Sequence, residues 1–194
     1  MTDDLRAALD PVADAFDAVG VVYRIGGSVA SSALGVARSS IDVDLVADLR
    51  VEHVAPLVRR LGDAYYADES MILDAIRLRD SFNLIHLETM MKVDVFVLKQ
   101  RAFDRAAFAR VAHQTLGEGA SERSFPLTTA EDVVLHKLEW FRLGGGESHR
   151  QWEDILGVLK LQGTALDRVH LDRWARDIGV SDLLDRALSE AGLA

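Results

Sequence analysis

The segment at residues 24–49, RIGGSVASSALGVARSSIDVDLVADL, constrains the fold of this chain most strongly. It begins with a Gly-Gly-Ser turn, continues through a run of small residues, and ends in an apolar stretch with two aspartates two positions apart. A strand places residues i and i+2 on one face, so Asp42 and Asp44 point together while the apolar residues around them point into a core. The segment therefore predicts a strand, a glycine turn, a short helix and a second strand with a carboxylate pair.

Two carboxylates on one face repel each other, and a divalent cation between them relieves that repulsion. Hard oxygen ligands suit Mg²⁺, which usually takes further ligands from water and from substrate phosphates. Gly26, Gly27 and Ser28 are suited to hold such phosphates, because glycine permits close backbone approach and a helix N-terminus attracts anions. An isolated Asp-x-Asp pair is also common on strands with one solvated face, so the pair alone does not decide the function.

Asp94 lies in MKVDVFVL, another short strand whose valines face the opposite way. Three aspartates on adjacent strands could hold two Mg²⁺ ions, which would align a hydroxyl with the α-phosphate of a nucleotide and neutralise the charge of the departing pyrophosphate. One aspartate would also be placed to accept the proton of the hydroxyl. The combination of glycine turn, carboxylate pair and third aspartate favours a metal-dependent site over a solvated strand.

Hydrophobic periodicity predicts an α+β fold, with a mixed sheet, flanking helices and a small C-terminal helical part. We expect helices at 5–19, 29–37, 51–62 and 101–114, and strands at 21–25, 41–48, 71–79, 82–88 and 92–98. A loop follows at 117–124, and everything from Thr128 onward has helical period, including an antiparallel helix pair on either side of GGGESH. We therefore predict a catalytic core at residues 1–120 and a helical part at 121–194 that closes over the site.

Composition excludes several kinds of site. The chain has no cysteine, which removes disulfides, thiolate zinc sites and a cysteine nucleophile, and its six histidines show no ligand spacing. A net charge of −9 argues against a broad nucleic-acid surface, although a local basic patch is compatible with it. The acidic first residues and the lack of a long apolar run predict a cytoplasmic protein with no membrane partner.

Three features together resemble the signature of the polymerase-β-like nucleotidyltransferase superfamily: Gly27-Ser28, Asp42-x-Asp44 after a thirteen-residue gap, and the later Asp94. Over about residues 20–160, RSSIDVDLV, FNLIHLETMMKVDVFVL and EDVVLHKLEWFRLGGGESHRQWEDILGVL are similar to the abortive-infection branch, which includes toxins of the AbiEii kind. The resemblance implies that Asp42, Asp44 and Asp94 bind metal.

The same resemblance implies that Gly27 and Ser28 hold nucleotide phosphates. It also implies that a lysine and an aspartate of the C-terminal helices, Lys137 and Asp154, belong to the active site. A cognate antitoxin would be the partner of a toxin-like member. The choice of acceptor varies widely across the superfamily and does not transfer.

Several other residues have both a functional and a structural interpretation. Arg38 is close enough to Asp42 in sequence to reach a triphosphate, or it caps the end of a helix. Arg150 and Asp154 have the spacing of a helix salt bridge. For His86 and His136, packing or surface positions are the expected roles. The tryptophans at 140, 152 and 174 could stack bases, but their spacing with aliphatic residues favours core packing.

Lys137 lies on or beside the apolar stripe of Val133, Val134, Leu138 and Phe141. Its ammonium either reaches past the core to water or meets a phosphate across the cleft.

These features predict an Mg²⁺-dependent nucleotidyltransferase that moves a nucleoside monophosphate from an NTP to a hydroxyl of a tRNA, a protein or a small molecule and releases pyrophosphate. The alternatives are a catalytically silent nucleotide-binding or partner-binding module, and a small-molecule enzyme of the aminoglycoside type. Three mutually repelling aspartates speak against the silent module, which has no use for them.

Overall fold

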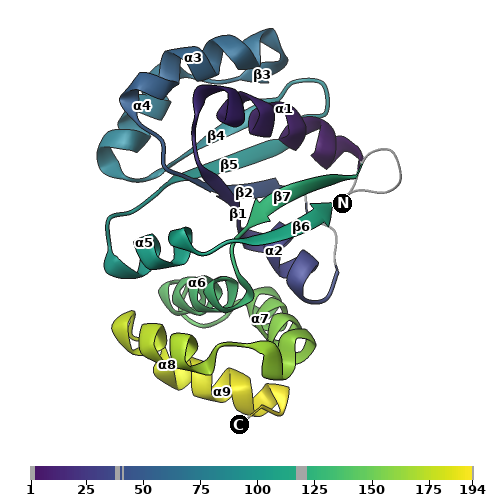
Figure 1. Cartoon of the computed structure of the whole chain (residues 1–194), viewed down its shortest axis with the longest axis vertical. Coiled ribbons are helices and arrows are strands. Elements are labelled where there is room, and N and C mark those ends of the chain that lie inside the picture. The colour runs from purple at the N-terminus through teal and green to yellow at the C-terminus, as the bar shows by residue number, and fades with distance from the viewer. Residues whose placement is uncertain (1–2, 38–39, 41, 117–121, 194) are drawn as a thin grey trace.

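A computed structural model of the chain describes residues 3–37, 40, 42–116 and 122–193. One mixed sheet of seven strands has the order β3-β4-β5-β2-β1-β7-β6 (Figure 1). The strands are β1 Tyr23–Ile25, β2 Asp42–Ala47, β3 Tyr65–Tyr66, β4 Ser81–His86, β5 Lys92–Val97, β6 Ala112–Leu116 and β7 Arg123–Leu127. The predicted α+β architecture, with its C-terminal helices, is confirmed.

Helices flank the sheet and extend beyond it. The first five are α1 Asp3–Val19, α2 Gly27–Leu34, α3 Val51–Leu61, α4 Glu69–Leu78 and α5 Ala102–Ala109. The C-terminal helices are α6 Ala130–Leu143, α7 His149–Gln162, α8 Arg168–Asp177 and α9 Ser181–Ala191. Short 3-10 turns lie at Gly62–Ala64 and Gly163–Ala165. No helix in the described ranges is long and apolar enough to cross a bilayer.

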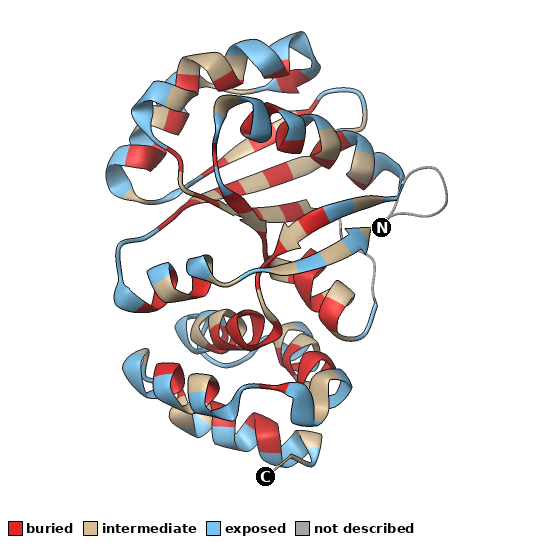
Figure 2. Cartoon of the chain, in the orientation of Figure 1, coloured by how far each residue is buried: buried red, intermediate tan, exposed pale blue. Residues whose placement is uncertain are grey.

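The sheet has one covered face and one face that borders the site. Helices α1, α3 and α4 lie over the first face, above the sheet in Figure 1. Val43, Leu45, Val93 and Val95 are fully buried, as the alternating pattern predicts for residues that point into the core. Buried and intermediate residues accordingly alternate along the central strands (Figure 2). Asp44 has the opposite orientation and faces the C-terminal helices, because successive strand residues point to opposite faces.

The helical part packs tightly on α2. A side chain at Gly35 would meet the backbone nitrogen of Val158 in α7 at 2.8 Å, so this contact needs glycine. The Gln162 amide donates a hydrogen bond of 2.7 Å to the Leu34 carbonyl at the end of α2. Helix α2, which begins at the Gly-Gly-Ser turn, is therefore fixed from the C-terminal side.

Two element predictions were wrong. Residues 71–79 form most of helix α4 and not a strand, because Ile72, Ala75 and Ile76 are buried at helical spacing and the Asp68 carboxylate accepts the Met71 N–H as N-cap. The helix expected over 101–114 ends at Ala109, and the last residues of that range enter strand β6. In β6 half-buried and exposed residues alternate, which is the pattern of a strand with one face against the protein and the other toward solvent.

Further observations concern a proline in the first helix, two strands that were not predicted and the division of the chain. Pro11 lies inside the single continuous helix α1. Strand β3 and strand β7 were not predicted, and β7 pairs with both β1 and β6. The predicted domain boundary at residue 120 therefore falls between two paired strands, and the first helix after the sheet starts at Ala130. Part of the predicted loop at 117–124 lies outside the described residues.

Candidate active site

A cavity of about 570 Å³ lies between the open face of the sheet and helices α5, α6 and α7. Both halves of the chain contribute to its wall. The side chains and turns that line it include Arg24, Gly26, Gly27, Ser28, Asp42, Asp44, Phe96, Lys99, Arg101, Asp104, Phe108, His136, Lys137, Glu139, Trp140, Arg150 and Asp154. Most of the residues singled out in the sequence therefore converge on one hollow.

The two aspartates of β2 project into this cavity from the same face of the strand. Strand β5 runs parallel to β2 and places Asp94 directly beside Asp44. Both oxygens of Asp94 are already engaged, because Lys92 Nζ lies 2.8 Å from Oδ2 and the Asn83 amide donates to Oδ1 at 2.7 Å. Among the described residues that line the cavity, Asp42 and Asp44 are present and Asp94 is not.

Asp44 carries the clearest electrostatic signal of the site. Burial raises the pKa of its carboxyl, and the charges of Asp42 and Asp94 raise it further. The Ser28 N–H and the Lys137 ammonium act in the opposite direction and lower it. An ionised Asp44 is thus destabilised by its surroundings, which is the situation that a bound cation would relieve.

The Gly-Gly-Ser turn is shaped around the same carboxylate. Gly27 has a φ of +51°, and a Cβ on it would overlap the Asp44 carboxylate and lie 2.8 Å from the Asp44 Cβ. The Ser28 N–H, one of the free donors at the start of α2, bonds to Asp44. The Ser28 hydroxyl lies 2.5 Å from that of Ser40, which in turn donates to Asp42 Oδ1 at 3.1 Å. Glycine at position 27 is required by both backbone conformation and space.

Lys137 and Asp154 meet across the helix pair α6–α7. The Lys137 ammonium lies 2.8 Å from Asp154 Oδ2, and the side chains are 11% and 7% exposed. Lys137 therefore does not simply extend to water, as one interpretation of the sequence held. Its partner is the second residue that the resemblance places in the site, and the ammonium is close enough to Asp44 to lower the pKa of that carboxyl.

The sequence did not reveal the third group of charges in the cavity. Arg101, at the start of α5, forms ion pairs with Asp104 one turn later and with Glu139 in α6. These contacts raise the pKa of the Arg101 guanidinium above its usual value. A local sequence pattern could have predicted only the contact with Asp104, which lies three positions after Arg101, because Glu139 lies 38 positions away.

The aromatic residues divide into two groups. Trp152 and Trp174 are buried, as predicted, but Trp140 is 49% exposed, lines the cavity and contacts the Phe96 ring at 6.4 Å between centroids. The core-packing prediction for Trp140 was wrong, because its helix position faces the hollow between the two parts of the chain.

The histidines occupy packed positions. His86 is buried with a 2.8 Å bond to Thr89, and His136 packs on Phe103 with a pKa lowered by burial.

The sequence predicted Arg38 as a site residue and Arg150 as a helix partner of Asp154. Arg38 lies outside the described residues. Arg150 is exposed at the rim of the cavity, while Asp154, its expected helix partner, pairs with Lys137.

The donor chemistry of Asp42 and Asp44 fits a hard divalent cation, since both offer carboxylate oxygens toward the cavity and Asp44 is electrostatically strained. Across the described residues, however, no three histidine or acidic side chains surround a common metal position. Lys92 and Asn83 hold the Asp94 carboxylate, and Asp94 would join the pair most readily if its contact with Lys92 were exchanged for the cation.

Known structures share the fold of this chain. No family model and no curated protein matches the sequence. The solution structure of the antibiotic-resistance factor ANT(2'')-Ia superposes with a TM-score of 0.58 at 15% identity, covering 96% of this chain and 99% of the other. The crystal structure of ANT(2'')-Ia in complex with adenylyl-2''-tobramycin gives 0.56 at 17%, covering 88% and 97%. An antigenic nucleotidyltransferase-like protein from Paracoccidioides brasiliensis gives 0.51 at 17%, covering 98% and 92%. The chain thus has a nucleotidyltransferase fold.

Proposed function

We propose that this protein is an Mg²⁺-dependent nucleotidyltransferase that transfers a nucleoside monophosphate from an NTP to a hydroxyl acceptor. The observation that carries the proposal is the position of Asp42 and Asp44 in one cavity with the N-terminus of α2 and with Lys137. In the reaction the acceptor oxygen forms a bond to the α-phosphorus, the bond to pyrophosphate breaks, and the hydroxyl proton passes to a base.

Asp42 and Asp44 would hold the cation. Asp94 would become a third ligand when its carboxylate exchanges the contact with the Lys92 ammonium for one with the cation. Bound Mg²⁺ would neutralise phosphate charge and orient the reacting groups. Gly26, Gly27 and Ser28 would lie against the phosphates, because this turn lacks side chains that would block the approach.

Lys137 is proposed to stabilise the negative charge that develops on pyrophosphate, with Asp154 fixing the ammonium through their 2.8 Å ion pair. The carboxylate that accepts the hydroxyl proton would be Asp44 or Asp94, since these lie side by side in the parallel register of β2 and β5. The residues that touch substrate thus come from both the sheet and the helical part.

The fold likeness to ANT(2'')-Ia, which was solved with an adenylylated tobramycin, supports a small-molecule acceptor for this proposal. The resemblance of residues 20–160 to AbiEii-type proteins instead suggests a tRNA or protein acceptor and an antitoxin partner. The meeting of Lys137 and Asp154 at the cavity is consistent with that resemblance.

One experiment separates these possibilities. The protein is incubated with each α-labelled NTP, MgCl₂ and a cell extract divided into small-molecule, RNA and protein fractions, while pyrophosphate release is followed. We expect label in one fraction together with stoichiometric pyrophosphate. NTP binding without release in any fraction would support the silent binding module, and absence of both would contradict the proposal.

A further inference from the structure

Arg24 occupies the floor of the cavity on the far side of Asp44 from Ser28. Strand β1 runs antiparallel to β2, with Arg24 opposite Val46, and the Gly26 N–H bonds to the Asp44 carbonyl. Each two-residue step along a strand is about 7 Å, so the order along the floor is Ser28, Asp44 and then Arg24. If the phosphates lie at the start of α2, Arg24 belongs to the end of the cavity where the acceptor enters.

Arg24 makes no ion pair with any carboxylate in the described part of the chain. Its Nη1 donates to the Tyr23 carbonyl at 2.8 Å and its Nε to the Arg110 carbonyl at 3.3 Å. The guanidinium also lies over the Phe108 ring, 4.9 Å from the centroid. Burial lowers the pKa of Arg24, yet an arginine stays charged at neutral pH. A partly desolvated cation with only neutral partners favours an anion at its free edge.

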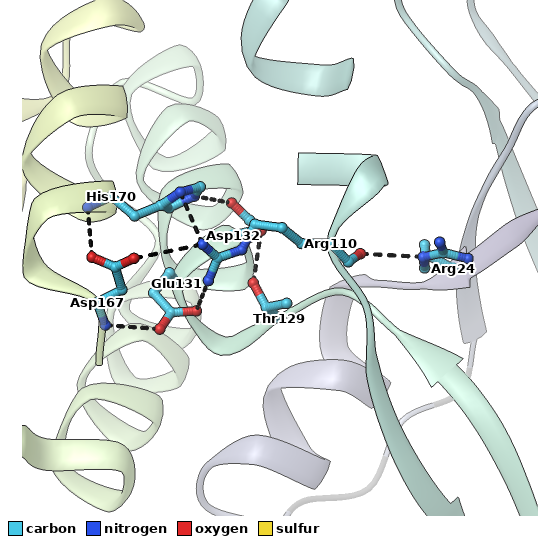
Figure 3. Close-up of polar contacts among 7 residues, drawn as sticks. All are labelled: Arg24, Arg110, Thr129, Glu131, Asp132, Asp167 and His170. Carbon is cyan, nitrogen blue, oxygen red and sulfur yellow. Dashed lines mark hydrogen bonds and ion pairs between the residues drawn. The ribbon is translucent and has the colours of Figure 1, made fainter. Parts of the chain in front are cut away.

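The surroundings hold Arg24 in this position. One of the two carbonyls that accept from the Arg24 guanidinium belongs to Arg110. The Arg110 side chain is in turn fixed by Glu131 at 2.8 Å and by the fully buried Asp132 at 3.3 Å (Figure 3). Asp132 is held in turn by the Thr129 hydroxyl and by His170, each at 2.7 Å. The network joins α6 and α8 to the residues just before β6. It thereby fixes the position of the Arg110 carbonyl that accepts from Arg24.

The other charges at this end do not cancel the charge of Arg24. The carboxylates of Asp104 and Glu139 share the single positive charge of Arg101, and Lys99 in the lining balances the negative charge that is left. This end of the cavity therefore carries a net positive charge beside the aromatic surface of Trp140. A polycationic acceptor would be repelled here, and an acceptor with a carboxylate or phosphate would be attracted.

We propose that Arg24 is a specificity-determining residue that binds an anionic group of the acceptor, so that the acceptor carries both a hydroxyl and a carboxylate or phosphate. This inference rests on the proposed function, because it assigns Arg24 to the acceptor and not to the NTP. A carboxylate and a phosphate would both present an anionic oxygen to Arg24. Competition with an NTP analogue separates an anion of the acceptor from a phosphate of the nucleotide.

The probes are three phenols of similar size whose side-chain ends differ in charge: 4-hydroxyphenylacetate, its neutral amide and the cationic tyramine. Binding to the intact protein is measured by ligand-observed NMR, alone and with a saturating non-hydrolysable NTP analogue and MgCl₂. We expect the anion to bind at least about tenfold more tightly than tyramine and to remain bound with the analogue present. Arg24→Gln should remove that preference and Arg24→Lys should keep part of it.

Arg79→Gln is the matched control, since Arg79 also donates to a backbone carbonyl, that of Leu98, and lies outside this cavity. It should leave all three affinities unchanged, and thermal unfolding of each variant checks the fold. Equal binding of the three probes by the parent, no binding of the anion at millimolar concentration, or an unchanged preference in Arg24→Gln would overturn the proposal.

The analogue separates the two anion sources. If it displaces the anionic probe, or if Arg24→Gln weakens the analogue as strongly as the probe, Arg24 serves the nucleotide and the inference is wrong. Either result leaves NTP turnover by the parent intact, so the failure of this inference is distinct from failure of the proposed function.

Discussion

Replacement of Gly27 by alanine tests the geometry of the phosphate turn directly. Gly27 has a φ of +51°, and a residue with a Cβ loses about 1–2 kcal/mol in this left-handed region. The new Cβ would also overlap the Asp44 carboxylate, and overpacking of this kind costs about 1–3 kcal/mol. We therefore expect Gly27→Ala to lower the free energy of unfolding by about 2–5 kcal/mol.

Gly62→Ala provides the matched control for this substitution. Gly62 has nearly the same φ, +54°, but a Cβ there would meet no atom within 4 Å. Its loss of stability should be only the backbone cost of about 1–2 kcal/mol, so the difference between the variants measures the clash with Asp44. Urea unfolding followed by circular dichroism gives both values.

The two variants should also differ in activity. Gly27→Ala displaces the Asp44 carboxylate, and a shift of about 1 Å in a catalytic group can reduce transfer about 100-fold. Gly62→Ala should retain the parent rate. If Gly27→Ala matched Gly62→Ala in both stability and transfer, the turn would not be built around Asp44, and the phosphates would have to bind elsewhere.

Three further substitutions test separate contacts. Lys137→Met should lower the free energy of unfolding by about 3–5 kcal/mol in urea titrations, because it removes the cation of a buried ion pair. Arg142→Met breaks an exposed interhelical pair and should cost far less, and equal losses would contradict the buried pair. Asp44→Asn tests the raised pKa of the Asp44 carboxyl in the parent. Because the folded parent binds that proton more tightly than the unfolded chain does, its free energy of unfolding falls as the pH rises above about 3.8 and the carboxyl ionises. The variant should be at least as stable as the parent at pH 7 without metal and should lose part of this pH dependence, whereas a less stable variant would contradict the repulsion. Gly35→Ala should lower the melting temperature through a loss of about 1–3 kcal/mol, since its Cβ would meet the α7 backbone at 2.8 Å, and an unchanged melting temperature would refute that contact.

Local patterns predicted the centre of the site because its residues lie on one short strand and one turn. Alternation places Asp42 and Asp44 on one face, and a similar strand places Asp94 beside them in the register observed. The pattern could not show that Lys92, two residues before Asp94, already neutralises it. A strand pattern gives the face of a side chain and not its partner.

The remaining errors have physical causes in tertiary structure. The run MILDAI contains residues with strand preference, yet the Asp68 cap and burial against the sheet and α3 select a helix. Trp140 follows an apolar stripe, but its position faces the cavity between the sheet and the helical part, which only the packed structure creates. Arg24 and the network of Arg110 depend on contacts between residues 86 positions apart, which no local pattern contains.

The most direct test of the account measures pyrophosphate release by the parent, by Asp44→Asn and by Asp63→Asn. These assays use saturating NTP, MgCl₂ and the acceptor fraction that takes up label. Asp63→Asn makes the same chemical change at an exposed residue outside the cavity. We expect rapid release by the parent and by Asp63→Asn, and a loss of at least about 100-fold in Asp44→Asn with the fold intact. Release by Asp44→Asn at the parent rate would contradict this expectation.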